Sequence, residues 1–390
     1  MIDTQIKKLI AAEKKRQRKG INLIASENYV SKDVLSALGS ELTNKYAEGY
    51  SAHRYYGGNE VSDKIENLAK ERALKLFALN PAEWAVNVQP LSGSPANVAV
   101  YLALVPAGGK IMGMTLSHGG HLTHGHKVSI SGKMWHQVPY GVDAKTELLN
   151  YDELKHIAAH EKPALIVAGY TAYPRIVDFK RFREIADSYN AYLMVDMSHF
   201  AGLVAGGVYP SPFPYADIVT TTTHKTLRGP RSALIFSKKD ERGLPTKIDK
   251  AVFPGMQGGP HLNQIAAVAV ALKEASMPAF RKYAAQVVAN AKAFADEFQK
   301  LGWRVVSGGT DSHLLLLDTW MNGKGIGGKE ASERLENAGI IVNKNTIPND
   351  ARSPVDPSGL RLGTPAETTR GKKEKDFREI AQKVDRILKS

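Results

Sequence analysis

The sequence predicts an α/β protein with a mostly parallel central sheet and a smaller α+β domain near its C-terminus. Between residues 60 and 275, short apolar runs alternate with stretches of helical periodicity, which is typical of βαβ units. Beyond residue 300, strand-like and helix-like stretches follow in a mixed order. We therefore expect an N-terminal arm with loops (1–59), a large α/β domain (60–275) and a small domain (276–390).

Periodicity assigns the elements of the large domain. Apolar residues recur three and four positions apart in the expected helices, which cover Glu60–Leu79, Ala96–Leu104, Tyr151–His160 and Phe179–Tyr189. The expected strands are short apolar runs that suit a buried parallel sheet. They cover Ala85–Val88, Lys110–Met114, Leu165–Ala168, Tyr192–Asp196, Ile218–Thr222 and Ala233–Ser237.

The flanking regions have their own expected elements. A first helix has one apolar face, formed by Ile2, Ile6, Leu9 and Ile10. A long helical stretch, Leu262–Leu301, is expected to connect the two domains. In the small domain we expect strands at Trp303–Ser307, Leu314–Leu317 and Ile340–Val342. Helices are expected near Glu330–Ala338 and from Lys372 to Leu388.

The composition limits the class of protein. The 390 residues are 43% hydrophobic, which is enough for a large core. There is no cysteine, which excludes disulfides, thiolate catalysis and cysteine metal sites and fits a reducing compartment. We see no signal peptide, and no apolar run approaches the length of about 20 residues that spans a bilayer. We therefore expect a cytoplasmic protein.

The formal net charge is +13, from 52 Lys and Arg against 39 Asp and Glu. Such an excess occurs in nucleic-acid-binding proteins. Here the basic residues are dispersed, and the densest runs, 14–19 and 372–373, lie on expected terminal helices. Solvated helix faces explain these runs better, and a positive field also attracts anionic substrates. Nucleic acid is therefore the alternative partner rather than the expected one.

Lys225 is the most informative single residue. It follows four consecutive threonines and His224 at the end of an expected strand. This placement is explained if the amine of Lys225 forms a covalent imine with an aldehyde cofactor. Nearby hydroxyl groups and a cation would then hold the phosphate of that cofactor. Burial and nearby positive charge lower the pKa of a lysine as this chemistry requires. The alternative is an ordinary strand end with a solvated lysine.

Other residues fit pyridoxal phosphate, which needs a carboxylate at its ring nitrogen and donors for its phosphate. Asp196 ends an apolar strand, where ligand-facing groups lie in open α/β sheets, although it would also suit a helix N-cap. His199 follows, where it would lie over or beside a ring. Ser92, Gly93 and Ser94 precede an expected helix and would form an anion site at its N-terminus.

Two loops contain more Gly, Tyr and Pro than a chain reversal requires. They run from Tyr46 to Gly58 and from Phe253 to Pro260. Neither has a helical or strand period, so each is expected to be a shaped loop that binds a ligand.

A set of motifs in a specific order now points to one family. They are Ala25-Ser-Glu-Asn28, Tyr46-Ala-Glu-Gly-Tyr50, Arg54-Tyr-Tyr-Gly-Gly58, Ser117–Gly125, Val195-Asp-Met197, Thr220–Lys225, Phe253-Pro-Gly255, Gln257-Gly-Gly-Pro260 and Gly359–Pro365. With these motifs the chain resembles the bacterial-type serine hydroxymethyltransferases over essentially its whole length. The resemblance implies a fold-type-I pyridoxal-phosphate-dependent transferase, similar to aspartate aminotransferase in fold. It also implies a homodimer or dimer of dimers whose active sites combine loops of two subunits.

The implied reaction interconverts serine plus tetrahydrofolate with glycine plus 5,10-methylenetetrahydrofolate. Lys225 would hold pyridoxal phosphate as an imine, Asp196 would contact the pyridinium nitrogen, and His121 would stack on the ring. The other cofactor-binding residues implied by the resemblance are Ser92, Gly93, Ser94, Thr171, His199, His224 and, from the other subunit, Gly258 and Gly259.

The resemblance also implies the substrate-binding residues. Arg361 would clamp the substrate carboxylate with its bidentate guanidinium, assisted by Ser26. Glu48 and Tyr56 of the other subunit would handle the hydroxymethyl proton and the substrate. Further substrate-binding residues are Tyr46 and, around the folate, Tyr55, Leu116, Gly120, Leu122, Asn345 and Ser353.

The cofactor ring is an electron sink for a carbanion at the α-carbon of the amino acid. Breaking the Cα–Cβ bond of serine requires removal of the hydroxyl proton or attack on Cβ by the folate nitrogen. A carboxylate such as Glu48 suits the proton transfer. The sequence leaves both routes open.

Alternative readings concern metal, nucleotide and a second reaction. His118, His121, His124 and His126 would form a metal cluster only if the intervening glycines kept helical spacing, so we expect no metal site. The stretch Gly323–Lys329 imitates a P-loop but is followed by an acid, Glu330, instead of Ser or Thr. The nearest alternative enzyme is a folate-independent aldolase of β-hydroxy amino acids such as threonine. The Tyr46–Tyr56 loop and Asn345 disfavour it, since an aldolase needs no pterin site.

Some positions depart from the family pattern. Ser51-Ala-His53 replaces a more usual Pro-Gly-Lys or Pro-Gly-Arg, which puts the loop shape near Tyr55 in doubt. Tyr170 stands where a small residue is usual, so it would narrow the pocket or pack elsewhere. Neither departure removes a residue with an implied role.

Overall fold

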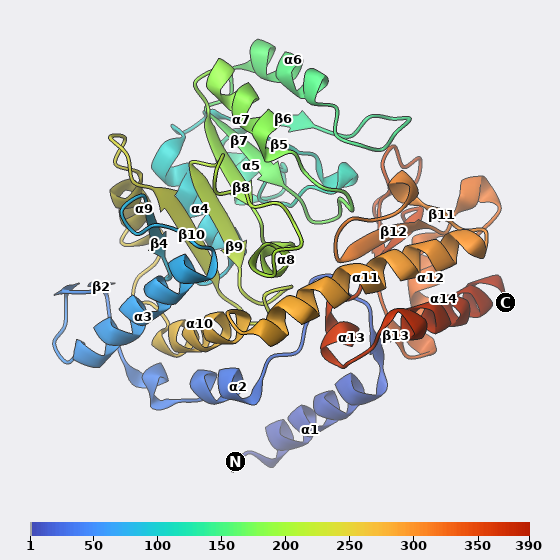
Figure 1. The fold of residues 1–390 in the computed structure, drawn as a ribbon, viewed down its shortest axis with the longest axis horizontal. Coiled ribbons are helices and arrows are strands. Elements are labelled where there is room, and N and C mark those ends of the chain that lie inside the picture. The colour runs from blue at the N-terminus through green and yellow to red at the C-terminus, as the bar shows by residue number, and fades with distance from the viewer. Residues whose placement is uncertain (1) are drawn as a thin grey trace.

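The computed structural model describes residues 2–390 and is built around a seven-stranded sheet (Figure 1). Across the sheet, the strands are β4 (Trp84–Asn87), β10 (Ala233–Lys238), β9 (Ile218–Thr222), β8 (Tyr192–Asp196), β7 (Leu165–Gly169), β5 (Lys110–Met114) and β6 (His136–Tyr140). β6, β5, β7, β8 and β9 are mutually parallel, and only β10 runs antiparallel to its neighbours. The expected α/β fold with a mostly parallel sheet is confirmed.

Helices cover both faces of this sheet, as the apolar runs require. One face packs on α4 (Gly93–Leu104), α5 (Ile130–Met134) and α9 (Leu244–Val252). The other packs on α3 (Glu60–Leu76), α6 (Tyr151–Glu161), α7 (Phe179–Ser188), α8 (Ala201–Ala205) and α10 (Leu262–Ala275). Successive strand residues alternate between the two cores, for example Ile111 with Met112 and Leu165 with Ile166.

One strand of this sheet was not expected. β6 lies at the sheet edge, and its residues alternate between exposed and buried positions. Pro139 is tolerated there because an edge strand has one side without ladder hydrogen bonds. The strand therefore lacks the continuous apolar run that marks the buried strands.

The expected helical stretch Leu262–Leu301 is helical over most of its length but is divided into two helices. α10 ends at Ala275, and α11 runs from Pro278 to Lys300. Met277 has an extended backbone, with φ −80° and ψ 149°, as a residue before proline prefers. Pro278 then occupies the first turn of α11, where its missing N–H costs nothing.

A second, four-stranded antiparallel sheet lies beyond α11, at the right of Figure 1. Its strands are β11 (Arg304–Val305), β12 (Leu314–Asp318), β15 (Gly359–Gly363) and β14 (Asn343–Asn345). It shares a core with α11, α12 (Gly328–Asn337) and α14 (Glu374–Lys389). β15 was not expected, because glycine at both ends weakens its strand signal.

The N-terminal residues pack against this second unit through a short ladder. β1 (Ile21–Asn22) pairs in parallel with β13 (Ile340–Ile341), which occupies most of the expected strand Ile340–Val342. α1 (Thr4–Lys19) precedes it and buries none of its residues, and Ile6, Leu9 and Ile10 are exposed. α2 (Lys32–Leu38) lies on α10, and α13 (Pro365–Thr369) precedes α14.

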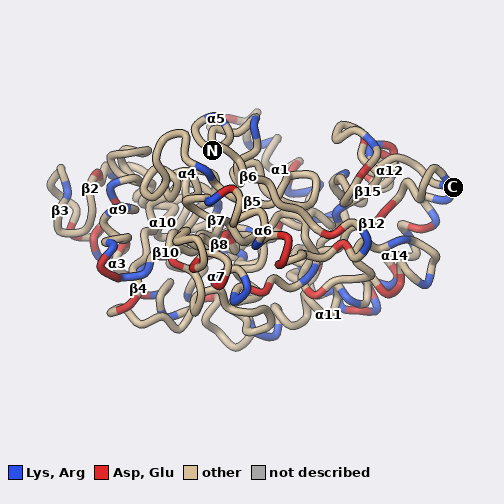
Figure 2. Tube along the Cα trace, turned by 90° about the horizontal axis from the view of Figure 1, so that it is seen from above, with Lys and Arg blue, Asp and Glu red and all other residues tan. Residues whose placement is uncertain are grey.

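The charge is spread over the molecule. Basic and acidic residues follow one another along the same helices, as α3 and α14 show in Figure 2. This distribution agrees with solvated helix faces. In the described range 2–390, no helix is both long and apolar enough to cross a bilayer.

A small hairpin, β2 (Gly49–Tyr50) and β3 (His53–Arg54), lies at the end of the molecule farthest from the C-terminus (Figure 1). Arg54 anchors it, since its guanidinium donates to the backbone oxygens of Ala47 and Gly49 at 2.9 and 2.7 Å. Arg54 also pairs with Asp63 at 2.8 Å and with the fully buried Glu66 at 2.7 Å. The loop is thereby fixed to α3.

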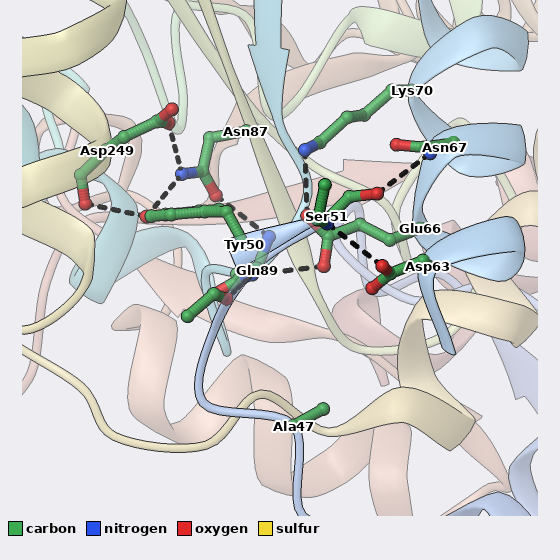
Figure 3. A network of polar contacts seen from close by, with 12 residues as sticks. Ala47, Tyr50, Ser51, Asp63, Glu66, Asn67, Lys70, Asn87, Gln89 and Asp249 are labelled. Atoms are coloured by element: carbon green, nitrogen blue, oxygen red, sulfur yellow. Dashed lines mark hydrogen bonds and ion pairs between the residues drawn. The ribbon is translucent and has the colours of Figure 1, made fainter. Parts of the chain in front are cut away.

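Glu66 is the centre of the wider network in Figure 3. Its carboxylate also accepts a hydrogen bond from Gln89 at 3.0 Å and pairs with Lys70 at 2.7 Å. A buried carboxylate needs such partners because desolvation penalises its charge. Nearby, Tyr50 donates to the backbone oxygen of Asp249 at 2.6 Å, which fixes the hairpin to α9.

We predict that Glu66→Ala lowers the free energy of unfolding by about 3–5 kcal/mol, because it leaves the buried Arg54 guanidinium short of a partner. Glu71→Ala removes an exposed carboxylate from the same helix and is expected to change stability by less than about 0.5 kcal/mol. Urea unfolding followed by circular dichroism measures both variants. Equal effects would contradict the role of Glu66.

Candidate active site

Several strands of the large sheet end at one polar cavity. The carboxyl ends of parallel strands meet at one edge of a sheet, and ligands bind there in open α/β folds. The loops after β5, β7, β8 and β9 and the N-terminus of α4 enclose about 270 Å³. The lining residues are Ser26, Glu27, Ser92, Gly93, Ser94, Asn97, His121, Tyr170, Thr171, Asp196, Ser198, His199, Thr222, His224, Lys225 and Arg231.

Lys225 enters this cavity from the segment after β9. Burial lowers the pKa of its amine to about 8, although the carboxylate of Asp196 raises it, and the charges of Arg361 and Arg231 lower it further. A larger fraction of the amine is therefore neutral near pH 8 than in a solvated lysine. A neutral amine is the form that attacks a carbonyl carbon.

Asp196 lies in the same cavity as a carboxylate. Burial alone would raise its pKa, but a hydrogen bond from His124, the charges of His124 and Lys225 and a bond from Ser198 hold the pKa well below its usual range. One oxygen accepts from Asn97 at 2.8 Å and lies 3.1 Å from His124, while the other accepts from the Ser198 backbone at 3.0 Å. Asp196 thus presents a permanent negative charge.

The cavity histidines are held neutral. Burial, followed by the charges of His124, Lys225 and Arg361, lowers the pKa of His121 to about 4, although Asp196 raises it. The pKa of His199 is lowered well below its usual range, chiefly by burial. Burial and the charges of Lys225 and Arg231 lower the pKa of His224 to about 3. Neutral imidazoles can stack on a ring or form hydrogen bonds without adding charge.

One end of the cavity fits an anion. Ser92 precedes α4, and its hydroxyl makes no capping hydrogen bond. A side chain at Gly93 would lie 2.6 Å from Thr222, so only glycine fits there. His224 has a buried Nδ1 with no partner among residues 2–390, and Arg231 lines the same cavity. Free helix N–H groups, hydroxyls and a cation suit a phosphate, so these residues fit the cofactor that the sequence predicts.

Arg361 belongs to β15 of the second sheet but faces the loop after β7. Its Nη1 donates to the backbone oxygen of Thr171 at 2.9 Å, and its Nε donates to Asn343 at 3.0 Å. Burial lowers its pKa to about 10, which leaves it charged at neutral pH. Its charge also lowers the pKa of Lys225, so the two cations act on the same cavity.

The hairpin residues form a separate cluster with the Phe253–Pro260 loop. Gly258 lies next to the Glu48 carboxylate, and Gly259 lies next to the Tyr46 ring. Tyr46 and Tyr56 contact edge to face with ring centroids 5.5 Å apart, and Tyr55 contacts Phe253 in the same way at 5.7 Å. None of these residues lines the 270 Å³ cavity. Tyr55 is 74% exposed, which is unusual for a large aromatic side chain.

A third group of predicted residues lies on two neighbouring segments. Leu116, Gly120 and Leu122 belong to the segment after β5, while Asn345 and Ser353 belong to β14 and the loop that follows. A hydrogen bond of 3.3 Å from Thr346 to the backbone oxygen of Ser117 joins the two segments. Leu122 and Ser353 are exposed.

Two residues that hold Asp196 had no predicted role at this site. Asn97 and His124 hold Asp196, yet they lie 99 and 72 positions from it, so only the folded chain brings them together. Tyr170 packs its ring against Tyr173 and Phe200 while lining the cavity, which shows how the chain accommodates this large residue.

The segments behind the metal and nucleotide alternatives can be located in the structure. Among the described residues, no group of three or more potential ligands could hold a metal ion. At the start of α12, the Asp356 carboxylate accepts a hydrogen bond from the backbone of Lys329 at 3.2 Å. A carboxylate in that position occupies the site that a P-loop offers to phosphate and would repel it.

Known proteins of one family are similar to the chain over nearly its whole length. A family model described as serine hydroxymethyltransferase matches residues 1–384. The serine hydroxymethyltransferase of Legionella pneumophila strain Corby is 57% identical over 386 residues, which cover 99% of this chain and 91% of that protein. The serine hydroxymethyltransferase of Koribacter versatilis strain Ellin345 is 56% identical over 378 residues, which cover 97% and 87%.

We predict that Lys225 in the cofactor-free protein becomes reactive near pH 8, below the range of a solvated lysine. Competitive acetylation read by mass spectrometry measures this, with the exposed Lys375 as internal reference. Asp196→Asn is expected to lower the midpoint, because the lost carboxylate had raised the pKa. Arg231→Gln is expected to raise it. Shifts in the reverse directions would contradict the assigned electrostatics.

Proposed function

The chain belongs to the serine hydroxymethyltransferase family, and on that basis we propose how its residues carry out the family reaction. This reaction transfers the hydroxymethyl carbon of serine reversibly to tetrahydrofolate and gives glycine and 5,10-methylenetetrahydrofolate. The family depends on pyridoxal phosphate. The observation that carries the proposal is the buried Lys225 amine beside the Asp196 carboxylate in one polar cavity.

Lys225 is proposed to bind the cofactor covalently through its amine. Asp196 would keep a proton on the ring nitrogen, since its own charge is permanent, and His121 would lie against the ring. The phosphate would occupy the anion site formed by Ser92, Gly93 and Ser94, with Thr171, His199 and His224 completing the pocket. When bound, pyridoxal phosphate supplies an electron sink for the carbanion at the substrate α-carbon.

Arg361 is proposed to bind the serine carboxylate. Its guanidinium is held by Thr171 and Asn343, so it is oriented before substrate arrives. Orientation of this kind removes part of the entropic cost of binding. Ser26 lines the cavity and would assist.

The exposed hairpin cluster is proposed to complete the cavity of a second copy of the chain. Glu48 and Tyr56 would then handle the hydroxymethyl proton, with Tyr46, Gly258 and Gly259 beside them. Exposed aromatic rings held rigidly by Arg54 are expected at an interface that becomes buried on assembly. A homodimer, or a dimer of dimers, is the assembly that this arrangement requires.

The pterin is proposed to bind between the hairpin and the segments joined by Thr346 and Ser117. Its surroundings would be Tyr55, Leu116, Gly120, Leu122, Asn345 and Ser353. We further propose the division into an arm (1–59), a large domain (60–275) and a small domain (276–390), which follows the two sheets. The cytoplasmic location stays a prediction of the sequence.

A visible absorption spectrum tests the proposed function. Purified protein loaded with pyridoxal phosphate is expected to absorb in the visible range, and Lys225→Ala is expected to lose the covalently attached chromophore. Glycine and tetrahydrofolate together are expected to produce a band at longer wavelength that neither produces alone. A chromophore without any folate response would instead indicate the folate-independent aldolase.

We predict that Arg361→Ala raises the serine concentration needed for half-maximal rate roughly 30-fold or more, because a buried carboxylate loses a partner worth about 2–5 kcal/mol. Steady-state kinetics at varied serine concentration measure this. Arg334→Ala removes a surface arginine that pairs with Glu330, and it should leave the serine requirement unchanged. An unaltered requirement in Arg361→Ala would rule out the carboxylate role.

Mixing two inactive variants tests whether active sites are shared. In a dimer of one Lys225→Ala chain and one Glu48→Ala chain, one of the two sites keeps both residues if each site takes Glu48 from the partner chain. Random re-association should therefore restore about a quarter of wild-type activity. Each variant re-associated alone is the control. Failure to restore activity, with mixed dimers confirmed by mass spectrometry, would place Glu48 and Lys225 of one site on the same chain.

A further inference from the structure

A second buried histidine lies behind the cavity and has no role in the proposed reaction. His313, immediately before β12, is 0% exposed and stacks on His199, with ring centroids 5.4 Å apart. The Nδ1 atom of His199 lies 3.2 Å from the Nε2 atom of His313, which is hydrogen-bond distance. His199 itself lines the cavity.

Both rings are neutral, so the shared hydrogen bond has one donor and one acceptor. Burial, followed by the charges of Arg361 and Lys225, lowers the pKa of His313 to about 3. The pKa of His199 is also lowered well below its usual range. A neutral imidazole has one N–H and one bare nitrogen, and its hydrogen-bond partners decide which nitrogen carries the proton.

The surroundings of His313 decide which of its ring nitrogens carries the proton. Its Nδ1 is buried and has no partner among residues 2–390. A proton there would be a buried N–H without an acceptor, which folded proteins avoid more strictly than a bare acceptor. The proton of His313 therefore lies on Nε2, which donates to Nδ1 of His199. His199 must then carry its own proton on Nε2, its remaining ring nitrogen.

We propose that His313 is a positioning residue that fixes His199 in the tautomer with an N–H directed at the cavity. The acceptor of this His199 N–H would be an anionic oxygen on the cofactor ring, and this part of the proposal rests on the proposed function. The tautomer itself follows from the protein alone. His313 would thus act on the bound ring without touching it.

The pair also joins the two sheets. His199 follows β8 of the seven-stranded sheet, whereas His313 leads into β12 of the four-stranded sheet. β12 pairs with β15, where Leu316 is the register partner of Arg361. The small sheet therefore supplies both the carboxylate clamp and the residue that orients His199.

Neutron diffraction from perdeuterated crystals locates the protons directly. We expect deuterium on Nε2 of both His199 and His313 and none on either Nδ1. Deuterium on Nδ1 of His199 would overturn the proposal. The same map from crystals without cofactor decides the tautomer even if the cofactor assignment fails, so the two failures are distinguishable.

Two substitutions separate hydrogen bonding from stacking. His313→Phe keeps an aromatic ring but removes the donor, whereas His313→Gln keeps an N–H near the position of Nε2 but removes the ring. We expect His313→Phe to weaken cofactor affinity by about tenfold, as loss of one hydrogen bond predicts, and His313→Gln to retain most of it. The serine requirement should stay near wild type in both, because Arg361 is unchanged.

Cofactor affinity is measured by fluorescence titration of the cofactor-free protein, and thermal unfolding checks that each variant folds. Wild-type affinity in His313→Phe together with weak binding in His313→Gln would show that the ring contributes only by stacking. Equal loss in both folded variants would also overturn the donor role.

Discussion

The rest of the site depends on keeping Asp196 ionised inside the protein. A buried carboxylate is stable as an anion only if donors and positive charge replace the lost water. Here Asn97, His124 and the Ser198 backbone supply the donors. Asn97 is held in turn by Thr220, whose hydroxyl donates to it at 2.8 Å. One charge therefore orders α4, the loop after β5 and the ends of β8 and β9.

The balance of charge around the cavity is positive and selects its ligands. Lys225, Arg231 and Arg361 bring three positive charges to the cavity, against the two carboxylates of its lining, Asp196 and Glu27. Burial, followed by repulsion from these positive charges, lowers the pKa of His199 and of His224 and keeps both rings neutral. A phosphorylated cofactor and an amino-acid carboxylate both supply the missing negative charge. Anion binding is thus favoured before any specific contact forms.

The elements that could be predicted from the sequence are those that neighbouring residues determine. Tyr192–Asp196 and Ile218–Thr222 were predicted with their observed bounds, because apolar and β-branched residues make up most of each. Pro278 marks the break between α10 and α11 in the sequence, but the apolar period continues on both sides of it. The edge strand β6 carries no continuous apolar run, and it could not be recognised without its neighbour β5.

Among the site residues too, only those with a local sequence signal could be identified from the sequence. Lys225 and Asp196 stood out because Asp196 ends a strand and Lys225 closely follows one. Arg361 and Glu48 look like ordinary surface charges in the sequence and entered only through the family resemblance. Asn97 and His313 had no local signal at all, since their partners Asp196 and His199 lie 99 and 114 positions away. Contacts of this kind are properties of the folded sheet edge rather than of any segment.

Because Arg361 lies on the second sheet, the packing between the two sheets sets its distance from Lys225. The amine of Lys225 follows a strand of the seven-stranded sheet, while the guanidinium that is proposed to bind the carboxylate belongs to the four-stranded one. The span between these two groups sets the length of amino acid that reaches both. Substitutions between the sheets, remote from every ligand atom, can therefore change which amino acid is preferred while Lys225 and Arg361 stay unchanged.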